Sequence, residues 1–319
     1  YLAPMVGRTD EHYRAFVRIL SKNIYLYTEM ITCDSFLHTN RKDYVVKEGE
    51  KNLTIQLAGS DPKKYGQCAS IIEDQGYDEI NLNIGCPSSK VVKGEFGACL
   101  MNNPDKVAEC VYEIKQSCDL PISIKTRLGL GYEENLDLLF TLINKTKVFG
   151  CSKYIIHARN AILNGLSPKK NRKIPVLRYA DVTTVKDSFP GLEFYLNGGV
   201  EDISEIRKNI NKFDGLMIGR RIYDNPMFLN QIEKEIYNNN ETLSRQSILK
   251  KYLKYALSLQ NKNTSNYLLL RHLFSLYYNT SSSKKWKKFL HDIIQSDKDI
   301  ELITNFEEST YDEEIKAYR

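Results

Sequence analysis

The sequence predicts an α/β protein that folds as a (β/α)8 TIM barrel, followed by a C-terminal all-helical domain. Three observations lead to this expectation: eight short apolar runs typical of strands, helix-forming stretches between them, and a change of pattern near residue 238. A barrel of this class takes about 250 residues. A chain of 319 residues therefore leaves room for one smaller appendage, and we expect domains at 1–237 and 238–319.

The predicted strands are recognised by their apolar, β-branched and aromatic residues. The eight runs are YLAPM, IYLYTEM, NLTIQLAG, EINLNIG, PISIKTRLG, SKYIIHA, LEFYLNGG and FDGLMIGR. Helical stretches lie between them, and two of these, DPKKYGQCASIIEDQG and NPDKVAECVYEIKQSC, open with Asp or Asn beside Pro, which is a helix-start signal. Strands that alternate with helices predict a parallel sheet, here closed into a barrel.

The C-terminal part of the chain has a helical pattern without strands. Apolar residues recur at helical spacing over 243–259, 267–278 and 286–294, after a linker that contains YNNNET. Residues 241–291 hold ten Lys or Arg and one acid, whereas residues 292–319 hold nine acids. The basic segment favours an anionic polymer as partner, although many such runs are simply solvated helix faces. The acidic tail is expected to be a last helix or partly disordered.

Composition excludes several classes of protein. Hydrophobic residues make up 42% of the chain, charged residues 27%, and mean hydropathy is −0.43, with no apolar run long enough to cross a membrane. Seven scattered cysteines without a CxxC pair argue against structural zinc and for a reducing compartment. We expect six of them to be small buried hydrophobes. A reducing compartment favours the cytoplasm, and an organelle stays the alternative because the sequence opens on YLAPMVGR, where no targeting segment can be read.

Active sites of such barrels form at the carboxyl ends of the strands, where this chain places polar residues or glycine. These residues are Pro4, Met5, Glu29, Gln56, Asn81, Asn83, Cys86, Lys125, Arg127, His157, Asn197, Gly198, Gly199, Gly219 and Arg220. The glycines of NGGV and IGRR follow the last two strands, where backbone N–H groups of this fold bind a phosphate, and Arg220 adds a cationic fork. Glycines at such places are as often turn formers as ligand contacts.

Lys125 and Gln56 suggest which phosphate compound is bound. A lone lysine in a polar cup needs an anionic partner to remain charged. A glutamine offers a donor and an acceptor, which suits a ring edge with alternating N–H and carbonyl groups. Together with a histidine and a phosphate site, these residues fit FMN, whose reduced form carries negative charge at the N1/O2 edge beside the lysine.

Ten separated segments resemble those of one enzyme family, in the same order. They are LAPM, YTEM, IQLAGSDP, EINLNIGCP, GEFGACLM, IKTRLG, HARNAILNGLSPKKNRKIP, LNGGV, MIGRRIYDNP and RHLF. The chain resembles a tRNA-dihydrouridine synthase, and among these the A-type branch. The resemblance runs from residue 2 to about residue 229 and extends more weakly to Arg271.

The resemblance implies an FMN enzyme that takes electrons from NADPH and reduces the C5–C6 double bond of a D-loop uridine, around position 20, in tRNA. Cys86 would deliver a proton to C5, a role open to a thiol because it is mostly protonated at neutral pH. Pro4 and Met5 would contact the flavin through their backbone, Gln56, Lys125 and His157 would contact its ring system, and Asn197, Gly198, Gly199, Gly219 and Arg220 its phosphate end. Asn83, Lys169, Arg172 and Arg271 would contact tRNA. The family is expected to be monomeric.

Alternatives remain open at several of these positions. Cys86 is otherwise an inert buried thiol, His157 a core histidine, and the loop with Lys169 and Arg172 a solvated charge run. Trp286, which lies among four lysines, is favoured as a core anchor over a base platform. Ser275 and Asn279 stand where the A-type branch has glycines, which leaves the fine tRNA contacts open.

Two rival functions are weighed against this interpretation. An FMN barrel that reduces a free pyrimidine, such as a dihydropyrimidine or dihydroorotate dehydrogenase, needs no basic helical domain, so the charge pattern counts against it. A non-catalytic RNA-binding barrel would not need Cys86, Lys125 or the glycines of the phosphate site.

Overall fold

The computed structural model describes residues 1–39, 44–47, 50–260, 264–295 and 299–307, and its contacts divide the chain into two compact units. The barrel unit comprises Tyr1–Val6 and Tyr25–Ile218, and the helical unit comprises Gly7–Ile24 and Gly219–Arg319. Segments 7–24 and 219–237 thus join the helices rather than the barrel. This division does not test which part binds a cofactor or tRNA, so the roles expected for 1–237 and 238–319 stay a prediction.

The barrel unit contains a sheet of seven parallel strands whose order in space follows their order in the chain. The strands are β1 (Leu26–Thr32), β2 (Leu53–Ala58), β3 (Glu79–Ile84), β4 (Ile122–Arg127), β5 (Cys151–His157), β6 (Glu193–Asn197) and β7 (Gly215–Met217). Each of them coincides with a strand expected from the sequence. The connections carry helices, as parallel neighbours require.

The first three residues close the sheet in the eighth position. Leu2 forms a parallel bridge with Ile218, just after β7, while its N–H donates to the Tyr25 carbonyl at 2.8 Å, just before β1. The Ala3 N–H donates to the Ile218 carbonyl at 2.9 Å. Residues 1–3 therefore bond to the segments at both edges of the seven-stranded sheet, and the expected eight-stranded barrel is confirmed.

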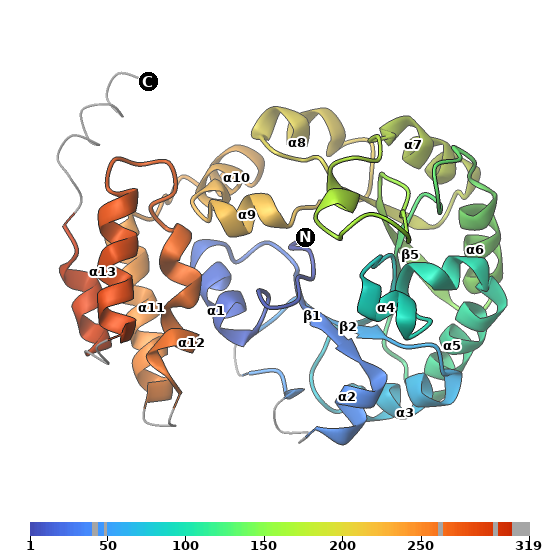
Figure 1. The fold of residues 1–319 in the computed structure, drawn as a ribbon, viewed down its shortest axis with the longest axis horizontal. Coiled ribbons are helices and arrows are strands. Elements are labelled where there is room, and N and C mark those ends of the chain that lie inside the picture. The colour runs from blue at the N-terminus through green and yellow to red at the C-terminus, as the bar shows by residue number, and fades with distance from the viewer. Residues whose placement is uncertain (40–43, 48–49, 261–263, 296–298, 308–319) are drawn as a thin grey trace. The chain divides into compact units, whose positions relative to one another are not determined.

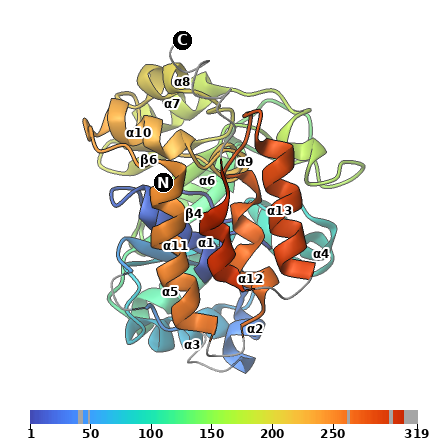
Figure 2. The same cartoon turned by 90° about the vertical axis from the view of Figure 1, so that its left-hand side faces the viewer.

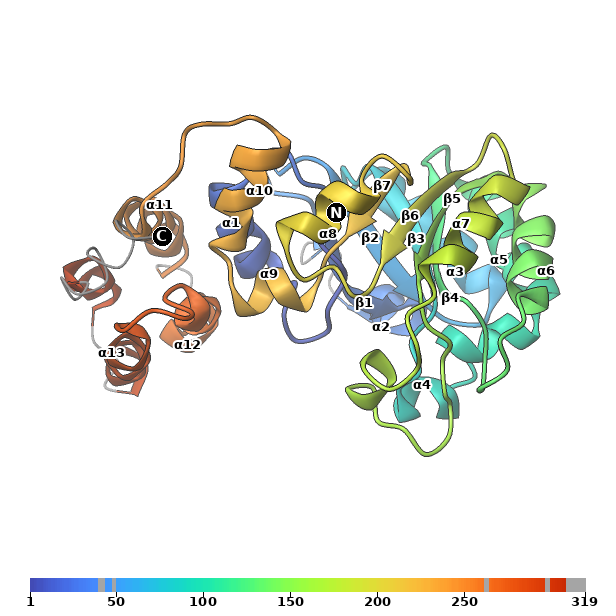
Figure 3. The ribbon, with the colours of Figure 1, turned by 90° about the horizontal axis from the view of Figure 1, so that it is seen from above.

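Helices cover the outer side of this sheet, as Figures 1 and 3 show for α3, α5 and α6. The helices of the barrel unit are α2 (Cys33–His38), α3 (Pro62–Glu73), α4 (Ser89–Lys93), α5 (Pro104–Ser117), α6 (Asp137–Lys147), α7 (Tyr179–Ser188) and α8 (Ile203–Asn209), with short 3₁₀ turns η2 (Gly97–Asn102) and η3 (Lys170–Arg172). Asp61 and Asn103 cap α3 and α5 through their side chains, each followed by Pro, so both predicted helix starts are confirmed.

The strand register arranges the interior side chains in levels, because register partners on parallel strands point to the same face. Nearest the carboxyl ends, Arg127 pairs with His157, which pairs with Asn197. Two residues earlier, Asn83 pairs with Lys125. Gln56, Asn81, Ser123 and Lys153 are partners one level further down. The predicted site residues of five strands, β2 to β6, thus face the same interior.

The helical unit is built from α1 and the helices after the barrel. Its elements are α1 (Glu11–Leu20), α9 (Arg220–Asp224), α10 (Phe228–Ile236), α11 (Arg245–Gln260), α12 (Asn266–Leu270), η4 (Arg271–Ser275), α13 (Ser283–Gln295) and η5 (Ile300–Asn305). Figure 2 shows α11, α12 and α13, and α1 packs against α11. The helix expected over 267–278 is instead a short helix followed by a 3₁₀ turn. Residues 308–319 of the acidic tail lie outside the described residues.

Trp286 anchors the core of the helical unit, as favoured from the sequence. It is fully buried, and its indole N–H donates to the Leu273 carbonyl at 2.8 Å. Tyr277 and Phe306 pack against its ring, while the four lysines around it are exposed. Asn279 adopts a left-handed φ of 56°, a conformation that asparagine tolerates better than most residues. Asparagine therefore replaces the glycine expected at this position with little backbone strain.

Candidate active site

Lys125 is a half-buried cation at the upper levels of the barrel interior. Its Nζ donates to the Asn197 Oδ1 at 2.9 Å, and the Asn197 Nδ2 in turn donates to the Met217 carbonyl at 2.7 Å. Burial, with a smaller contribution from Arg127, lowers the pKa of Lys125 to about 7. Within the described part of the chain Lys125 forms no ion pair. The site therefore favours an anionic ligand at this nitrogen.

The turn that carries Cys86 is held from both sides. The Asn83 Oδ1 accepts hydrogen bonds from the N–H groups of Gly85 and Cys86, at 3.2 and 3.0 Å, and the Cys86 carbonyl accepts from the Ala98 N–H at 3.1 Å. Gly97 has a φ of +65°, and a Cβ there would lie 2.8 Å from the Cys86 carbonyl oxygen. The backbone therefore fixes the origin of the Cys86 side chain at the end of β3.

Cys86 is partly exposed, which separates it from most other cysteines of the chain. Five cysteines are buried, namely Cys33, Cys68, Cys110, Cys118 and Cys151. The sixth that we expected to be buried, Cys99, is partly exposed as well, because it lies in the short turn η2 rather than inside a strand or a long helix. Exposure alone therefore does not distinguish Cys86 from Cys99, but of the two only Cys86 directly follows the end of a strand.

Gln56 is buried in β2 and makes two hydrogen bonds through its amide. Its Nε2 donates to the Asn81 Oδ1 at 2.7 Å, and its Oε1 accepts from the Asn83 Nδ2 at 2.9 Å. An amide has two N–H donors and two acceptor positions, so one of each is left for a ligand. Gln56 and Asn83 lie within their strands rather than after them, and they reach the site because alternate residues face the interior.

Arg127 stands among the polar strand-end residues of the sequence, which predicted no role for it. It is buried at the end of β4, where its Nε donates to the Gly85 carbonyl at 3.2 Å and its Nη1 to the carbonyls of Asn160 and Asn171, at 3.4 and 3.2 Å. Burial lowers its pKa to about 10. Its position in IKTRLG, two residues after Lys125, was the available signal. Arg127 joins the cysteine turn to the loop after β5.

His157 and the two glycines after β6 pack closely together. Gly198 and Gly199 have φ values of +99° and +78°. A Cβ on Gly198 would lie 2.9 Å from the His157 Cε1, and one on Gly199 would lie 2.5 Å from the Tyr179 hydroxyl oxygen. Only glycine fits both the conformation and the space. Pro4 and Met5, both half-buried, follow the closing segment 1–3.

Lys169 and Arg172 lie in the loop between β5 and α7. Lys169 is exposed and Arg172 is half-buried. The loop is fastened by Asn171, which is fully buried and whose Nδ2 and Oδ1 bond to the backbone of Ile162 at 2.9 and 2.7 Å. The basic loop is therefore a fixed structure at the same strand ends as Lys125 and Cys86.

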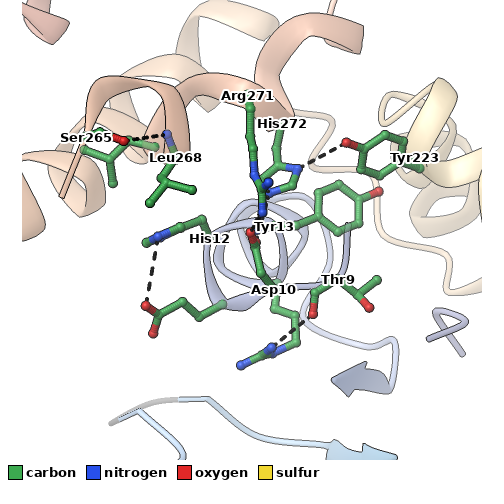
Figure 4. A network of polar contacts seen from close by, with 12 residues as sticks. Thr9, Asp10, His12, Tyr13, Tyr223, Ser265, Leu268, Arg271 and His272 are labelled. Carbon is green, nitrogen blue, oxygen red and sulfur yellow. Dashed lines mark hydrogen bonds and ion pairs between the residues drawn. The ribbon is translucent and has the colours of Figure 1, made fainter. Parts of the chain in front are cut away.

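The helical unit contains the remaining predicted residues. Gly219 precedes α9 and Arg220 is its first residue. Arg271 contacts the Asp10 carboxylate, as does His272, whose Nε2 lies 2.9 Å from the Asp10 Oδ1 (Figure 4). Burial by itself would raise the pKa of Asp10, but His272, the Tyr13 N–H and Arg271 outweigh it and lower that pKa. Arg271 is thus engaged inside its own unit.

The residues that the structure describes contain neither a cluster of metal ligands nor a membrane-spanning helix. No group of three or more His, Cys, Asp or Glu side chains suited to a metal ion occurs among the residues that the structure describes. None of the helices in that same part of the chain combines the length and the apolar character that crossing a membrane requires.

Comparisons with known proteins agree with the resemblance read from the sequence. The family model described as dihydrouridine synthase (Dus) matches residues 1–315. A tRNA-dihydrouridine(20/20a) synthase of Shewanella oneidensis is 40% identical over 294 residues, which cover 91% of this chain and 87% of that protein. Proteins of the same name from Synechocystis and from Escherichia coli K12 are each 39% identical, again over 91% of this chain, and over 88% and 85% of their own lengths. The chain belongs to the dihydrouridine synthase family.

Proposed function

We propose that the protein is a flavin-dependent tRNA-dihydrouridine synthase. It binds FMN, takes electrons from NADPH and reduces the C5–C6 double bond of a D-loop uridine in tRNA, in the cytoplasm. The single observation that carries the proposal is the partly exposed Cys86 beside an interior with an unpaired lysine. The family match along 1–315 favours this substrate over a free pyrimidine, and the names of the relatives favour positions 20 and 20a.

The residues at the strand ends fit a flavin mononucleotide. Lys125, whose pKa is lowered by burial to about 7, gains an anionic partner if the N1/O2 edge of a reduced flavin lies beside it. Gln56 has one N–H and one acceptor position left for a ring edge. Gly198 and Gly199 offer backbone that a larger residue could not supply. Asn197 and His157 complete this set, and the role of Gly219 and Arg220 as phosphate contacts rests on the sequence resemblance alone.

The bound flavin would supply hydride chemistry, and the protein supplies the proton and the alignment. Cys86 holds a proton at its Sγ and donates it to C5 of the uridine. Asn83 contacts the uridine while it fixes the backbone of Gly85 and Cys86. Lys125 stabilises negative charge, and the levels of side chains below it keep bulk water out of the interior. A positioned acid contributes roughly 10²–10⁴ to a rate.

Recognition of tRNA rests on cations at the strand ends. Lys169 and Arg172 project from a loop that Asn171 and Arg127 hold in place. Phosphate contacts of this kind fix the register of an RNA without reading its sequence. The target uridine must leave its stack to reach the site, which costs a few kcal/mol.

The redox cycle is tested with the purified protein. We expect flavin absorbance near ~450 nm that bleaches on anaerobic addition of NADPH and returns when unmodified tRNA is added. Return with free uridine but not with tRNA would support the free-pyrimidine enzyme instead. A protein that binds tRNA but takes up no FMN would contradict the proposal.

The tRNA contacts are tested by reversing charge with Lys169→Glu and Arg172→Glu together. Binding should weaken and its dependence on salt should flatten, since each phosphate contact contributes about 0.7–0.9 to the slope of log K against log salt. Lys64→Glu, which changes an exposed lysine paired with Asp34 on α2, is the control. An unchanged slope would place the RNA elsewhere.

A further inference from the structure

A row of buried side chains joins β4, β3 and β2 through hydrogen bonds in the barrel interior. The Ser123 Oγ donates to the Glu79 Oε1 at 2.5 Å, and the Asn81 Nδ2 donates to the Ser123 Oγ at 2.7 Å. The Gln56 Nε2 donates to the Asn81 Oδ1 at 2.7 Å. All four side chains are buried, with Ser123 and Asn81 fully so.

The same row continues to the cysteine turn. The Asn83 Nδ2 donates to the Gln56 Oε1 at 2.9 Å, and the Asn83 Oδ1 accepts from the N–H groups of Cys86 and Gly85. An unbroken series of hydrogen bonds therefore leads from Glu79, at the start of β3, to the backbone of Cys86, just after its end.

Every bond in this series has a defined direction, which is set at one end by Glu79, in an ion pair with Lys153, and at the other by the N–H groups of Gly85 and Cys86. An ionised carboxylate only accepts, so the Ser123 hydroxyl must donate to it and is left to accept. Asn81 must then turn its Nδ2 to Ser123 and its Oδ1 to Gln56. Gln56 must turn its Nε2 to Asn81 and its Oε1 to Asn83, which leaves the Asn83 Oδ1 to face the turn.

Without such a constraint a side-chain amide is ambiguous. Its oxygen and nitrogen have nearly the same shape, and a half rotation exchanges donor and acceptor with little change in packing. A rotated Gln56 would present the wrong group to a ring edge, and a rotated Asn83 would direct an NH₂ group at the N–H of Cys86. The direction of the series therefore decides what both amides can bind.

Glu79 forms a buried ion pair with Lys153, whose Nζ donates to its Oε2 at 2.5 Å. The Tyr27 hydroxyl also donates to its Oε1, at 3.3 Å. Both carboxylate oxygens therefore accept hydrogen bonds, and the carboxylate is the accepting end of the series.

We propose that Glu79, Ser123 and Asn81 are positioning residues, which fix the donor and acceptor faces that Gln56 and Asn83 present to flavin and uridine. The proposal rests on the proposed function, because it assigns Gln56 to the flavin. None of the three residues follows a strand, and none was selected from the sequence for this role.

Ser123→Ala tests the proposal, because it removes the one group that transmits direction from Glu79 to Asn81. We expect the dissociation constant for FMN, measured by quenching of flavin fluorescence on the full chain, to rise about tenfold, the worth of one good hydrogen bond. Oxidised and reduced flavin should be affected unequally. A tenfold change in their affinity ratio shifts the two-electron potential by about 30 mV.

Thr146→Val is the matched control. Thr146 is fully buried in α6, and its hydroxyl bonds to the Tyr154 hydroxyl and the Leu142 carbonyl at 2.7 and 2.8 Å. This variant therefore loses a buried hydroxyl with two partners, but it has no connection to Gln56. Its thermal stability should fall as that of Ser123→Ala does, while its FMN affinity and flavin potential should stay at the wild-type values.

Ser123→Cys keeps a weak donor of similar size and covers the case in which Ser123→Ala does not fold. Its FMN affinity and potential should lie between those of wild type and Ser123→Ala. If both Ser123 variants match Thr146→Val in affinity and potential, the positioning role is overturned while the proposed function stands. If wild type itself binds no FMN, the proposed function and this inference fall together.

Discussion

Three cations of the strand ends and of the helical unit differ in their partners. In the barrel unit, the contacts of Lys125 and Arg127 among the described residues are with neutral oxygens, an amide in one case and three carbonyls in the other, although Lys153 deeper in the same interior pairs with Glu79. In the helical unit, Arg271 meets the carboxylate of Asp10. Burial lowers the pKa of Lys125 and of Arg127. The pKa of Arg271 is raised, because Asp10 and Tyr267 outweigh the effect of burial.

This difference is the one we expect if Lys125 is kept for a ligand, whereas Arg271 stabilises the fold. A buried charge without a counter-charge is costly, and proteins retain such groups mainly where an external anion supplies the missing partner. An arginine that already forms an ion pair with a carboxylate of the protein needs no ligand as its counter-charge. We therefore expect changes at Lys125 to alter chemistry more than stability, and changes at Asp10 to do the reverse.

Lys125→Met should have the largest effect on turnover. It removes the cation expected beside the flavin, and loss of one preorganised group of this kind costs about 10²–10³ in rate. Reduction of bound FMN by NADPH, followed at the flavin absorbance band, should slow by that factor, while the thermal unfolding temperature should not fall. Lys64→Met, which removes an exposed lysine on α3, is the control. A normal rate of flavin reduction in Lys125→Met would contradict the inference that this lysine is kept for a ligand.

Cys86→Ala should slow a different step. FMN should remain bound and reducible by NADPH, while formation of dihydrouridine should slow by a factor of about 10² or more, since the positioned acid is lost. Single-turnover measurements with reduced enzyme and unmodified tRNA separate the two steps. Cys99→Ala, which changes the other partly exposed cysteine, should leave both steps unaltered. Near-normal product formation in Cys86→Ala would remove this thiol from the mechanism.

The sequence predicted the barrel and the strand-end residues because both follow from short-range patterns. Apolar alternation marked all eight strand positions, and the residues at or near their ends included Gln56, Lys125 and Asn197. The bond between Lys125 and Asn197 was not predicted, because it reaches across β5, which lies between β4 and β6 in the sheet.

Contacts between residues that are far apart in the sequence could not be predicted from these short-range patterns. Asp10 and Arg271 are 261 residues apart in the chain, and nothing local in HYRAF or RHLF indicates that they meet. For the same reason residues 7–24, which lie between two strands in the sequence, were assigned to the barrel although they pack with the helical unit. Glu79 and Ser123 were overlooked because a polar residue inside a strand looks like an ordinary solvent-facing position until the barrel closes over it.

Asp10→Asn should affect stability rather than chemistry. Asparagine still caps α1 through the Tyr13 N–H, which Asp10 now contacts at 2.9 Å, but it loses the charged bonds to Arg271 and His272. Charged hydrogen bonds are worth roughly 1.5–3 kcal/mol, so we expect a loss of about 2 kcal/mol in the free energy of unfolding by urea. FMN reduction by NADPH should be unchanged.

Asp224→Asn is the matched control for that loss. Asp224 meets Arg8 at 4.0 Å with an exposed carboxylate, and such surface pairs contribute about 0–1 kcal/mol. A loss as large as that of Asp10→Asn would show that charge, rather than burial of the pair, decides stability in the helical unit. Slowed flavin reduction in Asp10→Asn would mean that the structural pair also serves the reaction.

The smallest effect that we expect is a pH dependence in the FMN-free protein. Lys125 has a pKa of about 7 in the folded state against 10.5 ordinarily, so between these values the unfolded chain binds the additional proton. The free energy of unfolding should therefore rise with pH from about 7 upwards, by at most about 1.4 kcal/mol per pH unit. Below pH 7 the full cost of burying the charged lysine should be present.

Other groups titrate in the same range, but they do so equally in Lys125→Met. Urea unfolding of both proteins at pH 7, 8 and 9 isolates the lysine: wild type should gain stability relative to the variant, and FMN should suppress the gain because it supplies the anion. Parallel curves would show that Lys125 already has a counter-charge in the free protein.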